Sequence, residues 1–253
     1  MLTVRYVAVI FVCFSGFLPA LAQISPPGLD DTRAVAWGAI SITQETSAKW
    51  QTTIYLGASR ESNPDNYSLL NKPAIAVIDL SEQYKIDEHW SLSAALSYRK
   101  QNRYEDEPPY DSESPNLRDE LRYYMRLYYR HRVKRLSFTY SFRPEYRTYY
   151  NHFDPWSPIP YEYRFRLKAQ VAFPLNQSAS NQFILGNEVL TVAEPKFRDY
   201  HYTEDRLTTY FRHTFKRPSL IVDAGLMYQV LAGEGLITHF AFDAIFVNPF
   251  GKK

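Results

Sequence analysis

Cysteine is nearly absent from this chain of 253 residues. The single cysteine, Cys13, falls inside a short apolar segment that we expect to be removed on export, so the mature chain cannot form a disulfide. The sequence also lacks metal-ligand spacings and glycine-rich phosphate loops. We therefore assign no catalytic residue, metal or cofactor from the sequence.

Long apolar runs are missing as well, because nothing beyond residue 22 is long enough for a membrane-spanning helix. The N-terminus has Arg5, an apolar segment over residues 6–18, and a small-x-small ending at residues 20–22. These are the features of a secretory signal peptide, and we expect cleavage after Ala22. A transmembrane anchor is the alternative, but the run is short and Pro19 interrupts it. The sequence thus predicts an exported protein.

Charge of one sign is not in excess, since 29 lysines and arginines face 27 acidic residues. The net charge gives no indication of nucleic-acid binding, and we expect no nucleic-acid partner. No linker-like segment follows the signal, which favours one domain over residues 23–253. The chain does contain 21 tyrosines and 16 phenylalanines, with a negative mean hydropathy. Both properties suit a transmembrane barrel, whose strands are apolar on one side only.

Alternation at period two is the main structural signal. Residues 117–130, LRDELRYYMRLYYR, separate into an apolar, aromatic set and a cationic set, which a strand would send to opposite faces. The same residues also fit a helix, because Leu117, Leu121 and Tyr128 recur at helical spacing. Residues 161–173 alternate strictly without a helical stripe. We therefore interpret both segments as strands.

Eleven runs of this kind predict the fold: residues 34–43, 50–59, 74–86, 90–99, 117–130, 136–147, 161–173, 183–192, 206–216, 219–230 and 236–247. Short connections near 44–49, 87–89, 132–135, 174–181 and 217–218 alternate with long ones near 60–73, 101–116, 150–160 and 193–205. Outer-membrane barrels have short periplasmic turns and longer external loops. We predict an all-β, up-and-down antiparallel transmembrane β-barrel of about 10–12 strands. Since bacterial barrels use even numbers, an odd count indicates that one run is split or lies outside the wall, or that residues 23–33 contribute.

The polar phase of each strand would face the lumen of such a barrel. Acids and arginines there would meet as ion pairs, because a desolvated charge is costly unless it is paired. Two interiors fit this pattern. The ion pairs could fill the lumen, or the lumen could be an open pore in which the excess of cations favours anions. The predicted lumen charges are Arg118, Glu120, Arg122, Arg126, Arg130, Arg143, Glu145, Arg147, Glu162, Arg164, Arg166, Lys168, Glu188, Arg206 and Arg212. The predicted interfacial aromatic anchors are Trp50, Trp90, Tyr161, Phe240, Phe242 and Phe246.

His239 shares its strand face with Asp243, and Asp223 lies on the preceding run. No spacing places a nucleophile such as Ser219 beside this histidine. A lone inward histidine near an acid is more often a satisfied polar contact than a catalyst. An outer-membrane lipid-modifying enzyme is therefore an alternative rather than the first hypothesis.

Near the start of the mature chain lies the motif WGAISI at residues 37–42, followed after a turn by WQTTI at residues 50–54. It continues in Tyr/Phe strands that alternate with arginine. In these patterns it resembles an uncharacterised outer-membrane β-barrel family of Gram-negative bacteria, common in Bacteroidetes (domain of unknown function twenty-four-ninety). The resemblance covers nearly all of the mature chain and implies an outer-membrane barrel without an established activity. The ending Gly251-Lys252-Lys253 departs from the usual terminal aromatic, although Phe250 precedes it.

These patterns predict an integral outer-membrane protein of structural or passive-transport type. Its polar, arginine-rich lumen would be either a narrow pore or plugged. The expected partners are the lipid bilayer and small anions, and no protein partner is indicated. A partner-binding component of an envelope assembly and a soluble periplasmic barrel are the remaining alternatives.

Overall fold

The computed structural model describes residues 29, 32–69, 71–151, 161–193, 200–217, 219–232 and 235–251. The predicted signal peptide and its cleavage position near Ala22 lie outside the described residues. Within the described ranges there is no helix long and apolar enough to cross a membrane.

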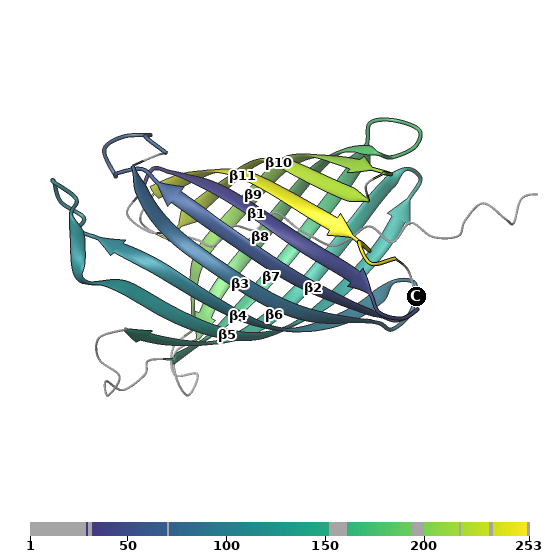
Figure 1. Cartoon of the computed structure of the whole chain (residues 1–253), viewed down its shortest axis with the longest axis horizontal. Coiled ribbons are helices and arrows are strands. Elements are labelled where there is room, and N and C mark those ends of the chain that lie inside the picture. The colour runs from purple at the N-terminus through teal and green to yellow at the C-terminus, as the bar shows by residue number, and fades with distance from the viewer. Residues whose placement is uncertain are drawn as a thin grey trace, which may run out of the picture.

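The described strands form one closed barrel (Figure 1). They are β1 (Ala34–Glu45), β2 (Trp50–Glu61), β3 (Lys72–Lys85), β4 (Trp90–Tyr104), β5 (Ser112–Val133), β6 (Leu136–Asn151), β7 (Tyr161–Pro174), β8 (Asn181–Ala193), β9 (Tyr200–Phe215), β10 (Leu220–Leu231) and β11 (Gly235–Val247). Each strand pairs antiparallel with the next one along the chain. Every alternating run assigned from the sequence corresponds to one of these strands, so the predicted fold class is confirmed.

The barrel closes through a parallel pair of strands. Residues 34–43 of β1 lie beside residues 238–247 of β11 in continuous register. An odd number of alternating strands leaves the first and last pointing the same way, so only a parallel pair can close the wall. The expectation of an even strand number is therefore wrong for this chain, because the eleven runs are eleven whole strands.

Two predicted long loops are partly strand. β4 continues to Tyr104 and β5 begins at Ser112, so much of the predicted loop 101–116 belongs to a hairpin that projects beyond its neighbours (Figure 1). β9 likewise begins at Tyr200, inside the predicted loop 193–205. Strand pairing here continues beyond the apolar band of the wall. The ends of these paired strands are polar and lack alternating apolar residues. The period-two pattern therefore does not identify them as strand.

The two ends of the barrel differ in their connections. Four, four and two residues join β1 to β2, β3 to β4 and β5 to β6. At the opposite end, ten, seven and nine residues join β2 to β3, β4 to β5 and β6 to β7. We call these the short-turn end and the long-loop end. The asymmetry is incomplete, because only three residues join β10 to β11 at the long-loop end.

Candidate functional site in the barrel interior

Glu145 lies at the centre of an ion-pair network inside the barrel. It comes from the inward phase of β6 and is 2% exposed. Its carboxylate lies 2.6 Å from Arg143 Nε, 2.9 Å from Arg164 Nε and 3.3 Å from Arg166 Nη1, with Arg122 Nε at 3.7 Å. One carboxylate thus faces four guanidinium groups from three adjacent strands. Such pairing is what allows these charges to be buried.

Four further carboxylates extend this network around the wall from β4 to β9. Arg147 contacts both Glu120 and Glu162. The contacts are Glu120 with Arg99 (3.7 Å), Arg122 (2.6 Å) and Arg147 (2.6 Å), Glu188 with Arg166 (2.5 Å) and Arg206 (3.9 Å), and Glu204 with Arg206 (2.8 Å) and Arg164 (3.7 Å). Most of these arginines touch two carboxylates, so the network is continuous rather than a set of isolated pairs.

An apolar cluster lies on the opposite side of the interior. Trp37 of β1, Tyr210 of β9 and Ile184 of β8 are buried together. They share one register row with Ala241 and Gly225, which lie between the two rings. The small residues leave room for the rings, since a Cβ added at Gly225 would lie 2.3 Å from the Tyr210 Cβ. The row therefore places two small residues between two large rings, which allows close packing.

Strand β2 holds Trp37 from the other side. Its indole Nε1 donates a hydrogen bond to Tyr55 Oη at 3.1 Å. Its ring lies over Gly57, where an added Cβ would come within 2.2 Å of Trp37 Cζ2. Gly57 is thus required by the close approach of the indole.

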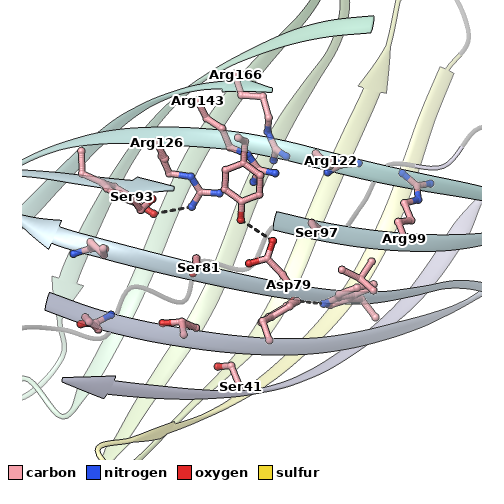
Figure 2. A pocket seen from close by; sticks show the side chains of 18 residues that line it. Ser41, Asp79, Ser81, Ser93, Ser97, Arg99, Arg122, Arg126, Arg143 and Arg166 are labelled. Carbon is pink, nitrogen blue, oxygen red and sulfur yellow. Dashed lines mark hydrogen bonds between the residues drawn. The ribbon is translucent and has the colours of Figure 1, made fainter. Parts of the chain in front are cut away.

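A polar cavity of about 140 Å³ lies in the barrel interior, and Figure 2 shows its lining. Small hydroxyl side chains from β1–β4 form one wall: Ser41, Thr53, Ser81, Ser93 and Ser97. Five arginines from β4–β7 line the cavity beside this wall: Arg99, Arg122, Arg126, Arg143 and Arg166. The cavity thus combines a hydroxyl-lined wall with a cationic wall.

Arg126 is held in this cavity by tyrosines. Its Nη1 donates to Tyr128 Oη at 2.8 Å, and its guanidinium carbon lies 5.5 Å from the centroids of the Tyr124 and Tyr128 rings. Tyr124 donates its hydroxyl to Asp79 at 2.8 Å, and the Arg143 guanidinium stacks over the Tyr124 ring at 3.5 Å. Asp79 is the only acidic residue that lines the cavity among the described residues.

The residues considered for catalysis do not come together as a catalytic group. His239 Nε2 lies 2.9 Å from Gln229 Oε1, and Gln229 also hydrogen-bonds the backbone of Leu29 at 3.3 and 3.4 Å. Asp223 forms a bidentate pair with Arg212, at 2.7 and 2.6 Å. Across the described ranges, no hydrogen bond joins His239 to an aspartate, and no three His, Cys, Asp or Glu residues are placed to hold a metal. The contacts of His239 are those of a structural polar residue.

The structure places all fifteen predicted lumen charges on β5–β9, in the phase opposite to the exposed apolar residues. Most are buried and joined in the network around Glu145. Arg118 and Arg130 lie toward the two ends of β5 and are half-buried. Arg118 stacks over Tyr149 at 4.1 Å, and Arg130 donates to Ser91 at 3.2 Å.

Glu204 is a buried member of the network that sequence reasoning missed. Glu204 lies inside the predicted loop 193–205. Its period-two spacing from Arg206 and Thr208, on the same inward face of β9, was the available signal.

Two of the predicted aromatic anchors lie at the short-turn end and face outward. Trp50 begins β2 and packs against Tyr84 with ring centroids 4.9 Å apart. Trp90 begins β4 and packs against Tyr129 at 4.8 Å. Trp50 and Trp90 are exposed, and the two pairs place aromatic rings at a common height along one rim of the barrel.

The other four predicted anchors lie at different heights. Tyr161 begins β7 at the long-loop end, where it packs 5.8 Å from the Tyr146 ring. Phe240 and Phe242 are exposed in the middle of β11, and Phe246 lies near the short-turn end of that strand. The six anchors therefore do not form a single ring around the barrel.

Comparisons with known proteins identify a family and a likeness in fold to solved structures. The model of a family described as Protein of unknown function (DUF2490) matches residues 34–235, from the start of β1 to the first residue of β11. No curated protein matches the chain. Among solved structures, the chain is similar to the beta domain of the Bordetella autotransporter Brka, with a TM-score of 0.47 and 10% sequence identity. That likeness covers 80% of this chain and 84% of the other.

Proposed function

The chain belongs to the family Protein of unknown function (DUF2490), and we propose that it is an integral outer-membrane β-barrel closed by its own interior side chains. The observation that carries this proposal is the inversion of polarity across the wall. Large apolar residues are exposed outside, while ion pairs are buried inside. A soluble barrel would have the opposite arrangement.

The exposed apolar surface extends around the whole barrel. Each of the eleven strands contributes at least one large, exposed apolar side chain. Examples from well-separated strands are Ile54 on β2, Met125 on β5, Leu167 on β7 and Phe242 on β11. Soluble monomers rarely expose contiguous apolar patches larger than a few hundred Å². A surface of this kind supports burial in a lipid bilayer.

Strand length and rim composition support the same environment. The shortest strands contain 12 residues, which exceeds the roughly 9–11 that a tilted strand needs to cross a bilayer. The Trp50–Tyr84 and Trp90–Tyr129 pairs at the short-turn end suit an interfacial girdle. We assign the short-turn end to the periplasm and the long-loop end to the exterior, as in other outer-membrane barrels.

The interior contacts support a plugged barrel over a wide pore. The network around Glu145 connects residues from β4 to β9, and the cluster around Trp37 fills the side that β8, β9, β11 and β1 form. Arg164 of β7 contacts Glu204 of β9 at 3.7 Å across the intervening strand β8, so side chains of this network occupy lumen space between non-adjacent strands. We infer a structural barrel rather than a general diffusion pore.

Membrane burial is tested by two leucines of equal exposure. Leu167 in the middle of β7 and Leu175 in the turn after it are both 60% exposed. We expect Leu167→Arg to destabilise the folded barrel in vesicles by about 2–4 kcal/mol, whereas Leu175→Arg has little effect. Urea unfolding with tryptophan fluorescence measures both, and carbonate washing of membranes reports insertion. Equal, small effects of the two substitutions would show that the apolar face does not contact lipid.

Closure of the barrel is tested in planar bilayers. We expect the refolded protein to give no stable conductance steps while it retains the heat-modifiable migration of a folded barrel on gels. Large, frequent steps from a folded preparation would contradict the plugged interior and favour a pore.

A further inference from the structure

The cavity beside Arg126 has a strongly asymmetric lining. From β1–β4 the cavity is lined by hydroxyl side chains such as Ser81 and Ser93, by the rings of Trp37 and Tyr55, and by Asp79. Five guanidinium groups from β4–β7 line the rest of the cavity (Figure 2). Asp79 is already the acceptor for the Tyr124 hydroxyl. A polar molecule in this cavity would therefore meet both cationic donors and neutral hydroxyls.

Arg126 differs from the other four arginines of the cavity. Arg99, Arg122, Arg143 and Arg166 each have a carboxylate oxygen within 4.0 Å. No carboxylate of the described residues lies that close to Arg126, whose hydrogen-bond partner is the neutral hydroxyl of Tyr128. Arginine has five N–H donors. Arg126 thus brings a full charge and further donors to the cavity without an acidic partner.

The interior around the cavity also carries more positive than negative side chains. Eight cationic side chains lie in the described cavity and network: Arg99, Arg122, Arg126, Arg143, Arg147, Arg164, Arg166 and Arg206. Six acids accompany them: Asp79, Glu120, Glu145, Glu162, Glu188 and Glu204. An unpaired charge inside a protein is costly, so this excess favours an anion as a counter-charge.

We propose that this cavity is a binding site for a small oxyanion, a phosphate or carboxylate group, with Arg126 as its main anchor. Guanidinium groups bind both kinds of group through paired N–H donors. The volume of about 140 Å³ admits a small anion and excludes a bulky one. Ser93 lies directly opposite Arg126 across the β4–β5 ladder and offers a hydroxyl to the same ligand.

The test measures anion binding to the purified full-length mature barrel in zwitterionic detergent. Isothermal titration with inorganic phosphate and with sodium acetate, at constant ionic strength, separates the two kinds of oxyanion. We expect saturable binding of at least one of them, weakened about 10-fold or more in Arg126→Gln, because charge-assisted hydrogen bonds are lost. Arg130→Gln is the matched control, since Arg130 lies on the same face of β5 but outside the cavity. It should bind as the wild type does.

A second variant keeps the test decisive if Arg126→Gln folds poorly. Ser93→Glu places a carboxylate opposite Arg126 and supplies it with an internal partner, so it should retain the barrel fold and abolish binding of either anion. Circular dichroism and heat-modifiable gel migration confirm folding of each variant. The proposal is overturned if the wild type binds neither anion, if Arg130→Gln loses as much affinity as Arg126→Gln, or if folded Ser93→Glu binds normally.

Discussion

Substitution of Glu145 by glutamine tests whether the interior ion pairs stabilise the barrel. Glutamine keeps the shape and one oxygen acceptor but removes the charge that faces four arginines. Three of these arginines have another carboxylate: Arg122 has Glu120 at 2.6 Å, Arg166 has Glu188 at 2.5 Å and Arg164 has Glu204 at 3.7 Å. Among the described residues, Arg143 has only Glu145. The main cost of the substitution therefore falls on one stranded, buried guanidinium.

The expected magnitude follows from that single stranded charge. Removing one partner of a buried ion pair costs about 3–5 kcal/mol. We expect Glu145→Gln to lower the free energy of unfolding by this amount, measured by urea unfolding in detergent or vesicles. Glu88→Gln is the control, because Glu88 lies in the turn before β4 with a side chain 84% exposed and should change stability by less than about 0.5 kcal/mol.

A double-mutant cycle separates the ion pair from unrelated packing effects. Arg143→Gln alone should cost less than Glu145→Gln, because Glu145 keeps three other arginines. The double variant should recover part of the loss, with a coupling energy of about 1–3 kcal/mol, since it removes the stranded cation. Additive effects, or a Glu145→Gln variant within about 1 kcal/mol of the wild type, would refute the reasoning.

Two further predictions concern the packing of Trp37 and a turn. Gly57→Ala should displace the indole and cost about 1–3 kcal/mol with a changed near-ultraviolet circular dichroism, whereas Gly38→Ala, with nothing within 4 Å, should change neither. Backbone N–H groups of Trp90 and His89 donate to the Asp87 carboxylate at 2.7 Å and lower its pKa. The stability from this turn is present above the ordinary aspartate pKa and is lost as pH falls through the lowered value. Asp87→Asn should remove that pH dependence of the urea midpoint, and an unchanged profile would contradict the assignment.

Most strands of the barrel wall could be predicted from the sequence, because the alternation of side chains along a strand can be read from that segment alone. The strict alternation of residues 161–173 identifies β7, and it also resolves the ambiguity of residues 117–130, which form the centre of β5. The same period correctly separates Arg126 from Met125, which is 49% exposed on the outer face. The family resemblance inferred from the motifs at residues 37–42 and 50–54 is confirmed by the family match.

The remaining features depend on residues that are distant in the sequence. The parallel pairing of β1 with β11 follows from the strand count and closure, which no single segment encodes. The contact between Arg164 of β7 and Glu204 of β9 skips a strand and depends on how both side chains cross the lumen. The partner of each arginine therefore could not be assigned from its own strand, although its inward direction could.

The position of the cavity follows from the unequal filling of the two sides of the barrel. The inward residues of β5–β7 are mostly arginines and tyrosines, long enough to reach across the lumen. Their partners Glu145, Glu188 and Glu204 lie on β6, β8 and β9, so the ion pairs draw these side chains toward that side of the interior. The adjoining strands β3 and β4 contribute short residues such as Ser81 and Ser93, which do not fill the space beside them. Space therefore remains beside the hydroxyl-lined wall, and Arg126 borders it because no carboxylate of the described residues draws that side chain into the network.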